Sequence, residues 1–299
     1  MTEPPARRPR AAMIATVVRT QPLAPSMVRV VVGGAGLAGF QPSPCADSYV
    51  KLVFPPAGSP AERPLDAQGR VDLEALGALL PADQPVRLRS YTVRAWDAAA
   101  GELTLDFVVH GDQGLAGPWA ASARPGDELL LLGPGGAWSP PDDAAWHLLV
   151  ADESALPAVA VALERLPAGA RAVALLEVEG PGDQVPIDGP ADRPGDRRAG
   201  RRDVDVRWVH RAGRPVGQAL VESVRALDWP AGMPHAFVHG EAGFVKELRG
   251  HLRQERSMPR EHLSISGYWR LGTDDEGWRA RKREWTREID EREAAAGLR

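Results

Sequence analysis

The sequence predicts two domains of different class: a six-stranded antiparallel Greek-key β-barrel, followed by a Rossmann-like parallel α/β domain. Three observations lead to this prediction. The 299 residues suffice for two hydrophobic cores. Short alternating or apolar runs fill the N-terminal half, whereas strand-like and helix-like runs alternate in the C-terminal half. A segment rich in Gly and Pro, residues 134–141, separates the halves. We therefore expect domains over residues 1–136 and 142–299.

The N-terminal half is expected to contain six short strands. The clearest is Leu103–Val109, in which the odd-numbered residues are apolar and would face a core. Pro125-Gly126-Asp127 is a strong turn signal before the last strand. Six antiparallel strands without long helices are typical of a small Greek-key barrel. The expected strands are Ala15–Thr20, Ser26–Val32, Ser48–Phe54, Val86–Ala95, Glu102–His110 and Asp127–Leu132.

In the C-terminal half, the alternation of strands and helices predicts a parallel sheet covered on both faces. The expected strands are Trp146–Ala151, Ala170–Val178, Val204–His210, Ala236–His239 and His262–Trp269. The expected helices are Ala155–Leu166, Gln218–Leu227, Phe244–Glu255 and about Glu276–Ala296. Trp278 and Trp285, seven residues apart, would dock the last, highly charged helix. The Gly-, Pro-, Asp- and Arg-rich span Glu179–Asp203 is expected to be a mobile surface insertion without a site.

Composition narrows the class of protein. Hydrophobic residues make up 43% and charged residues 25%, as in soluble globular proteins. A net charge of −4 and the lack of a basic stripe give no reason to expect a nucleic-acid or membrane-surface partner. The single Cys45 excludes an intramolecular disulfide framework and a cysteine-rich metal site, and it favours a cytoplasmic location. The sequence predicts neither a signal peptide nor a membrane-spanning segment.

The stretch Arg89-Ser90-Tyr91-Thr92 is the most informative motif. In an extended strand, Arg89 and Tyr91 point to one face, and the other two side chains point to the opposite face. A guanidinium can hold a phosphate in a bidentate fork, and a phenol ring can stack on a planar ring system. The motif therefore suits an aromatic cofactor that carries phosphates. Alone it is a weak signal, since many exposed strands contain such a string by chance.

A glycine-containing run, His110–Ala120, follows the strand that ends at His110. Gly111, Gly114 and Gly117 let the backbone approach a ligand closely, and a helix that starts near Trp119 can offer free N–H groups to a phosphate. A tight turn that needs positive φ explains the glycines equally well. Because this run follows the Arg89-Ser90-Tyr91-Thr92 motif, we favour the interpretation that it binds a cofactor.

Acidic residues follow two strands of the predicted parallel sheet. Asp152-Glu153-Ser154-Ala155 stands where a nucleotide phosphate lies in an open α/β sheet, although there is no Gly-x-Gly-x-x-Gly fingerprint. The two acids can equally serve as a helix cap. Glu241 would face the same crevice, or would simply be a solvated carboxylate at a helix start. Arg211 and Arg214 are candidates for binding a 2′-phosphate, and loop charges are the alternative.

Taken in order, these segments resemble the siderophore-interacting protein family, a branch of the ferredoxin-reductase-like flavoproteins. Each piece is weak, but the ordered set is specific and spans nearly the whole chain. The missing glycine fingerprint departs from the wider reductase pattern and agrees with this branch. The matching pieces are Val50-Lys51-Leu52, Arg89-Ser90-Tyr91-Thr92-Val93-Arg94, His110–Ala120, Pro125-Gly126-Asp127, Gly133-Pro134-Gly135-Gly136, Ala151–Ala158, Gly240-Glu241 and Gly267-Tyr268-Trp269-Arg270-Leu271-Gly272.

The resemblance implies FAD bound by the barrel, a site for NADH or NADPH on the second domain, and reduction of ferric siderophores. By position, Arg89 would contact the FAD phosphates, Tyr91 would flank the isoalloxazine, and Thr92 would hydrogen-bond near its reactive edge. A partly buried strand-end histidine is the alternative for His110. The remaining cofactor-binding residues expected are Ser90, Asp106, Val108, His110, Gly111, Gly114, Ala116, Gly117, Trp119, Asp152, Glu153, Ser154, Ala155 and Glu241.

Ferric siderophores are often anionic, so their site should be lined with cations. We expect Lys51, Lys246 and Arg270 to frame it, with a solvated surface charge as the alternative for each. Neither a catalytic acid or base nor a protein metal ligand is expected. Two other functions stay open: a flavin reductase that passes electrons to a ferredoxin or another small acceptor, and a carrier that binds ferric siderophore without catalysis.

Overall fold

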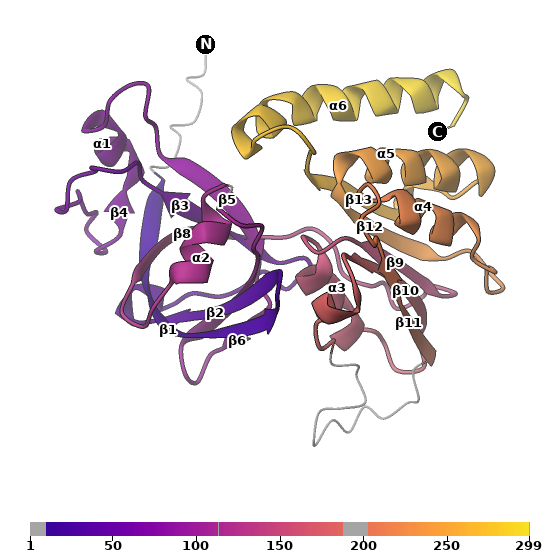
Figure 1. The fold of residues 1–299 in the computed structure, drawn as a ribbon, viewed down its shortest axis with the longest axis horizontal. Coiled ribbons are helices and arrows are strands. Elements are labelled where there is room, and N and C mark those ends of the chain that lie inside the picture. The colour runs from indigo at the N-terminus through magenta and orange to yellow at the C-terminus, as the bar shows by residue number, and fades with distance from the viewer. Residues whose placement is uncertain (1–9, 113, 188–202, 299) are drawn as a thin grey trace, which may run out of the picture.

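The computed structural model describes residues 10–112, 114–187 and 203–298. It contains two sheets that lie side by side, an eight-stranded antiparallel sheet and a five-stranded parallel one (Figure 1). The expected fold class, a β-barrel followed by a Rossmann-like α/β domain, is confirmed. The antiparallel sheet ends at Gly135 and the parallel sheet begins at His147. The boundaries 1–136 and 142–299 remain our proposal for the domains.

The barrel contains two short strands in addition to the six expected ones. Its strand order is β5-β3-β8-β1-β2-β7-β6, and β4 pairs with β1. Its strands are β1 (Ala11–Ala24), β2 (Met27–Gly33), β3 (Tyr49–Phe54), β4 (Val71–Asp72), β5 (Arg87–Thr92), β6 (Ala95–Asp97), β7 (Glu102–Val108) and β8 (Glu128–Gly135). Two short helices, α1 (Leu73–Ala78) and α2 (Ala116–Ser122), accompany them. Strands of two or three residues are too short to show an alternating pattern, which is why β4 and β6 were not expected.

The expected strand Val86–Ala95 divides because the chain changes partners within it. The Val93 N–H donates to the Ser48 carbonyl oxygen at 2.7 Å, beside β3, whereas the Arg94 N–H donates to the Thr104 carbonyl oxygen of β7 at 3.0 Å. Consecutive residues therefore bind different strands. This change joins the β5 end of the sheet to the β7 end and helps the barrel to close.

Alternation along β7 builds the barrel core, as the sequence predicts. Leu103, Leu105 and Phe107 are fully buried. Each such side chain stabilises the fold by about 1.5–3 kcal/mol relative to exposure. The Tyr91 ring of β5 packs on Phe107 with the ring centroids 4.3 Å apart, so β5 and β7 meet across the barrel.

The parallel sheet has the order β11-β10-β9-β12-β13. The chain runs outward from β9 on one side and then returns to β12 on the other, which creates a switch point between these two strands. Its strands are β9 (His147–Ala151), β10 (Arg171–Val178), β11 (Asp203–His210), β12 (His235–Glu241) and β13 (Leu263–Trp269). The helices are α3 (Leu156–Glu164), α4 (Gln218–Arg225), α5 (Ala242–Gly250) with a π-helical turn over His251–Glu255, and α6 (Asp275–Ala295). Of the expected insertion, residues 188–202 lie outside the described part of the chain, and Pro181–Asp183 forms a 3₁₀ turn.

Helix α3 lies between the two sheets (Figure 1). Met27 of β2 and Ala46 belong to the same buried cluster as the apolar side chains of α3. An ion pair between Arg94 and Glu164, 2.7 Å long, joins the barrel to the end of this helix. The barrel and the parallel sheet therefore share a packed seam.

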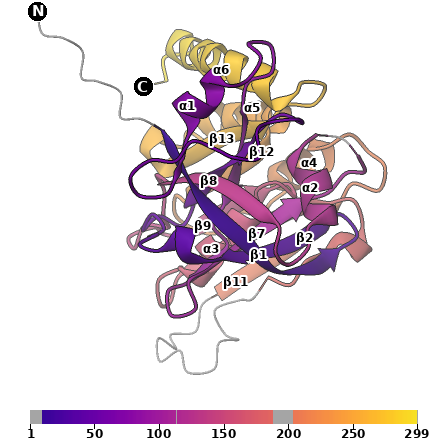
Figure 2. The same cartoon turned by 90° about the vertical axis from the view of Figure 1, so that its left-hand side faces the viewer.

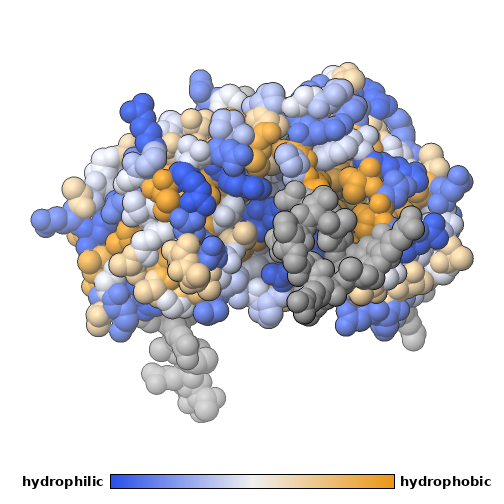
Figure 3. Space-filling model, turned by 90° about the horizontal axis from the view of Figure 1, so that it is seen from below, coloured by the Kyte–Doolittle hydropathy of each residue, from blue (hydrophilic) through white to orange (hydrophobic). Residues whose placement is uncertain are grey.

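Helix α6 crosses the top of the molecule above α5, with its first turn towards the barrel (Figures 1 and 2). The Asp274 carboxylate caps it by accepting from the Gly277 N–H. As expected, two tryptophans dock it. The ring centroids of Trp278 and Trp285 lie 5.4 Å apart, and Trp278 is buried. No helix in the described part of the chain combines the length and apolar character that a membrane span requires. On the underside of the molecule, hydrophobic residues form separate groups among hydrophilic ones (Figure 3).

Candidate functional site

The Arg89–Thr92 motif lies on β5, the strand at the end of the barrel sheet, with the expected alternation of side chains. Arg89 and Tyr91 stand opposite the buried Leu52 and Val50 of β3, whereas Ser90 and Thr92 stand opposite Lys51 and Tyr49. Burial raises the pKa of the Tyr91 phenol, so this ring stays neutral. A ligand along the β5 edge can therefore meet a cation and a neutral ring from one face of the sheet and two hydroxyls from the other.

The Arg89 guanidinium already binds anions. Its Nη1 and Nη2 atoms donate to the two carboxylate oxygens of Glu276 at 2.6 and 3.0 Å. Nη1 also donates to Asp275 at 3.2 Å and to the Leu88 carbonyl oxygen at 2.9 Å. The same planar fork matches a phosphate. Together with the neutral aromatic ring on the same strand face, this geometry fits a phosphate-bearing aromatic cofactor such as FAD.

The glycines of the 110–120 loop serve two different purposes. Gly111 and Gly114 adopt φ values of +55° and +84°, and a Cβ there would meet no atom within 4 Å. Their backbone conformation, and not crowding, therefore favours glycine. A Cβ on Gly117 would lie 3.1 Å from the Val108 carbonyl oxygen, so this glycine lets α2 pack closely on β7. The tight-turn alternative accounts for these glycines, and the open space beside the loop leaves room for a ligand. Gln113 lies outside the described residues.

The remaining barrel residues of the expected set divide between α2 and the α3 seam. Trp119 of α2 packs on Phe107 and Phe54, with centroid distances of 5.6 and 6.3 Å, and Ala116 is buried nearby. His110 is exposed at the strand end. Asp106, by contrast, is buried and accepts two hydrogen bonds from Arg29, at 2.7 and 2.9 Å. Val108 packs against the α3 cluster. The last two side chains thus lie at the seam between the domains.

Asp152 joins three strand ends at the carboxyl edge of the parallel sheet. Its Oδ2 accepts from the Glu241 N–H of β12 and from the Trp269 Nε1–H of β13, both at 2.8 Å. Its Oδ1 accepts from the Ser154 N–H and hydroxyl at 3.0 and 2.5 Å. Burial raises the pKa of Asp152 to about 6 in spite of these donors. A Cβ on Gly240 would lie within 2.7 Å of this carboxylate, so the close approach requires glycine.

The other acids of this edge are also engaged internally. Glu241 caps α5 by accepting from the Gly243 and Phe244 N–H groups. Glu153 binds Arg211 through both oxygens, at 2.5 and 2.7 Å. Ala155 is fully buried at the start of α3. Glu241 is therefore a buried cap of α5 and not a solvated carboxylate. Neither Asp152 nor Glu153 caps α3, because the N-cap position of that helix is Ala155 and accepts no side-chain hydrogen bond.

The two arginines suggested for a 2′-phosphate have carboxylate partners. Arg211 lies 3.2 Å from Glu179 and 3.5 Å from Glu177, in addition to its contact with Glu153. Arg214 pairs with Glu222 at 2.9 Å on the exposed surface. Any nucleotide phosphate bound by either arginine would have to displace a carboxylate.

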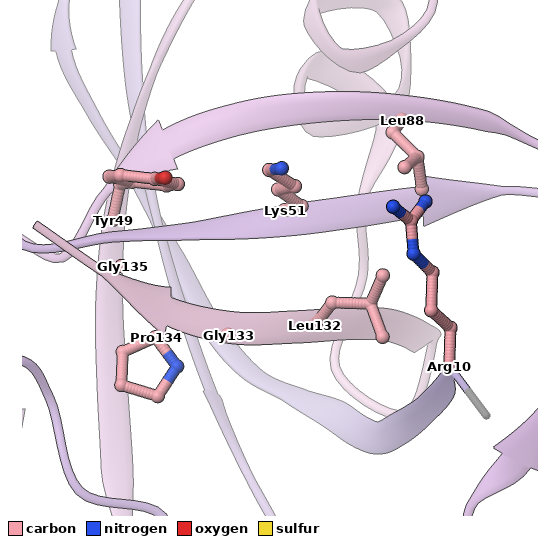
Figure 4. Close-up of a pocket in the computed structure, with 8 residues that line it drawn as sticks. All are labelled: Arg10, Tyr49, Lys51, Leu88, Leu132, Gly133, Pro134 and Gly135. Atoms are coloured by element: carbon pink, nitrogen blue, oxygen red, sulfur yellow. The ribbon is translucent and has the colours of Figure 1, made fainter. Parts of the chain in front are cut away.

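A cavity of about 260 Å³ opens on the outer face of β3 and β8 (Figure 4). The Lys51 ammonium and the Arg10 guanidinium extend over the same face as the flat Tyr49 ring, and neither cation forms an ion pair with another described residue. A Cβ on Gly135 would clash with the Tyr49 ring, so glycine lets the ring lie flat over the strand. The cavity is lined by Arg10, Tyr49, Lys51, Leu88, Leu132, Gly133, Pro134 and Gly135. Two free cations beside an aromatic ring suit an anionic, ring-bearing ligand.

Of the three expected substrate cations, Lys51 lines this cavity, and Lys246 and Arg270 do not. Lys246 lies on α5 and pairs with Glu288 of α6 at 3.8 Å. Arg270 follows β13 in an exposed turn. A lysine that the sequence analysis did not select, Lys282 of α6, donates to the Ser266 hydroxyl at 3.0 Å, and burial lowers its pKa.

Sequence reasoning also missed Arg10, Tyr49 and the two acids on Arg89. Arg10 and Tyr49 carry no motif that marks them. Asp275 and Glu276 look like ordinary acids of a first helical turn, where the helix dipole favours them. Their contact with Arg89 spans more than 180 residues, so no local signal points to it.

Both halves of the chain match known protein families. Residues 144–272 match the family model described as "Siderophore-interacting protein", and residues 16–138 match the one described as "Siderophore-interacting FAD-binding domain". An uncharacterized protein of Mycobacterium tuberculosis is 43% identical over 292 residues, covering 93% of this chain and 95% of the relative. Ferric vibriobactin reductase ViuB of Vibrio cholerae is 31% identical, covering 87% and 90%. The crystal structure of a siderophore utilization protein from T. fusca superposes with a TM-score of 0.71 at 33% identity, covering 90% and 96%.

Proposed function

Because the chain belongs to the siderophore-interacting protein family, we propose that it is an FAD-dependent oxidoreductase that passes electrons from NADH or NADPH to ferric siderophores. The observation that carries this proposal is the β5 edge. There Arg89 and Tyr91 offer an anion fork and a neutral ring, and the Lys51 cavity opens on the other face of the same strands. The family's ViuB relative, a ferric vibriobactin reductase, supports the choice of substrate class.

The barrel residues would bind and orient the flavin. Arg89 would hold its phosphates in the bidentate fork, and Tyr91 would flank its ring system with a neutral face. Thr92 and Ser90 would supply hydroxyls from the opposite face of the strand. When bound, FAD accepts a hydride and releases electrons singly, so the protein needs no acid or base of its own.

The cavity beside Lys51 would bind the ferric chelate. Lys51 and Arg10 would compensate the negative charge of the chelate, and Tyr49 would pack on its rings. One NADH or NADPH supplies two electrons, which reduce two Fe(III) ions to Fe(II). Siderophores offer hard oxygen ligands that prefer Fe(III), so reduction weakens the complex and frees the iron.

The carboxyl edge of the parallel sheet is the proposed position for the nicotinamide nucleotide, because ligands of open α/β sheets bind at the switch point. Asp152 and Glu241 would shape this edge by fixing the ends of β9, β12 and β13. Glu153, Ser154 and Ala155 remain proposed as neighbours of the nucleotide.

The decisive experiment is the visible spectrum of the purified protein, reconstituted with FAD and kept free of dioxygen. We expect NADH or NADPH to bleach the flavin band, and an added ferric siderophore to restore it while a ferrous chelator traps Fe(II). Faster reoxidation by a ferredoxin would instead support the flavin reductase alternative. A protein that binds ferric siderophore but no FAD would be a carrier and would refute the proposal.

A further inference from the structure

The first turn of α6 binds Arg89, the side chain that the proposed flavin site needs to hold a phosphate. Both Nη atoms of Arg89 point at the Glu276 carboxylate, and Nη1 has two further acceptors. Arg89 is only 14% exposed. A phosphate bound end-on, in the same fork, would use the same two nitrogens. Glu276 and a flavin phosphate therefore cannot both occupy this fork.

If Arg89 were released, Asp275 and Glu276 would both keep a favourable environment. Asp275 also pairs with Arg279 of its own helix at 2.9 Å, so it keeps a cationic partner. The Glu276 side chain is 41% exposed and can be hydrated once it leaves Arg89. Both acids stay in the first turn of α6, where the helix dipole favours them.

The rest of α6 is anchored without Arg89. Near its other end, Glu293 accepts two hydrogen bonds from Arg249 of α5, at 2.5 and 2.9 Å, and Asp290 accepts a third at 2.8 Å. Trp278, buried against β13, donates to the Gly267 carbonyl oxygen at 3.3 Å. The Asp275 and Glu276 side chains can therefore release Arg89 while the helix, held by Trp278 and by its far end, remains docked on the parallel-sheet domain.

We propose that the first turn of α6 is a tethered phosphate mimic that competes with the flavin phosphates for Arg89. While it holds Arg89 it latches the last helix to the barrel, and binding of FAD opens the latch. The competitor is part of the same chain, so its effective concentration at Arg89 is in the range of about 1 mM or more. This inference rests on the proposed function only in taking FAD as the phosphate-bearing ligand.

The test is the affinity of the apoprotein for flavins, measured by quenching of flavin fluorescence. We expect Glu276→Gln to bind FAD three- to tenfold more tightly than the wild type, because the competing charge is gone. Riboflavin, which has no phosphate, should bind both proteins equally. Glu284→Gln is the matched control: it removes an exposed carboxylate from the same helix, one that pairs with Arg287 at 3.5 Å.

Each outcome decides one question. Equal FAD affinity in the wild type and in Glu276→Gln would overturn the latch and leave the proposed function standing. An equal gain for riboflavin, or the same gain in the Glu284→Gln control, would also overturn it, since the effect would not involve the phosphates. If neither the wild type nor the variant binds FAD, the proposed function fails together with the latch.

Discussion

Two regions of this protein gather charged groups, and they use them in opposite ways. At the carboxyl edge of the parallel sheet, Asp152 is fully buried and Glu241 nearly so, and their oxygens accept from fixed protein donors. At the barrel edge, Lys51 lines an open cavity, and Arg89 is held by the half-exposed Glu276. Burial of the carboxylates separates the two. A buried carboxylate must find donors within the protein, whereas the exposed Glu276 can leave Arg89 to a ligand.

We propose from this comparison that the sheet edge is a rigid frame for the nucleotide and that the barrel edge is the adaptable surface for the flavin and the chelate. Charged residues that cluster in a sequence can therefore belong to either kind of site. The stability of the protein should respond to changes at the sheet edge, and its affinity for ligands to changes at the barrel edge.

The largest expected effect comes from Asp152→Ala. The variant leaves the Trp269 indole N–H and the Glu241 N–H without their acceptor in a buried place. We expect the free energy of unfolding to fall by about 4 kcal/mol, measured by urea denaturation. Asp142→Ala, which changes an exposed acid in the preceding loop, should alter it by less than about 0.5 kcal/mol. A loss as small as the control's would mean that the sheet edge is not a rigid frame.

The second prediction concerns pH. Burial lowers the pKa of His147 to about 4 and that of His239 to about 3, from the usual value of 6.5. Below pH 6.5 the unfolded chain therefore binds more protons than the folded protein. The free energy of unfolding should fall as the pH falls, by about 1.4 kcal/mol per pH unit for each histidine. Asp152, with its raised pKa, opposes this trend below about pH 6.

The histidine contribution can be isolated by a substitution. His147→Leu removes one titrating group. The dependence of the free energy of unfolding on pH should therefore be less steep between pH 6.5 and about 4 in the variant. The loss of stability over this range should be about 3 kcal/mol smaller than in the wild type. The measurement is a series of urea titrations of both proteins over this range. Parallel curves for the variant and the wild type would show that His147 does not carry the pH dependence.

The smallest effect is expected at the barrel cavity. Lys51→Ala should raise the KM for an anionic ferric chelate about fivefold at low salt and leave kcat nearly unchanged, because an open-sided cation contributes about 1 kcal/mol. Arg10→Ala should act in the same direction. Arg124→Ala, in the exposed turn before β8, serves as the control. Lys246→Ala tests the original expectation of three substrate cations: a rise in KM equal to that of Lys51→Ala would place Lys246 in the site as well.

Much of the fold followed from local patterns. The alternation of Leu103, Leu105 and Phe107 predicted a half-buried strand, and these side chains fill the barrel core. The change to alternating strands and helices predicted the parallel sheet. The short strands β4 and β6 were missed because two or three residues cannot show a period. The change of hydrogen-bond partner between Val93 and Arg94 was missed because it depends on where β3 and β7 lie in space.

The sequence by itself determined the two-domain architecture, the alternation that separates Arg89 from Ser90, and the family to which the chain belongs. These depend on residue periodicity and on the order of short motifs, both of which are local. Only the tertiary structure decided which charges meet: it brought Glu276 onto Arg89, engaged Asp152 with Trp269, and placed Arg10 beside Lys51 instead of Lys246. Such pairings depend on the close approach of segments that are far apart in the chain, and a one-dimensional pattern carries no information about that distance.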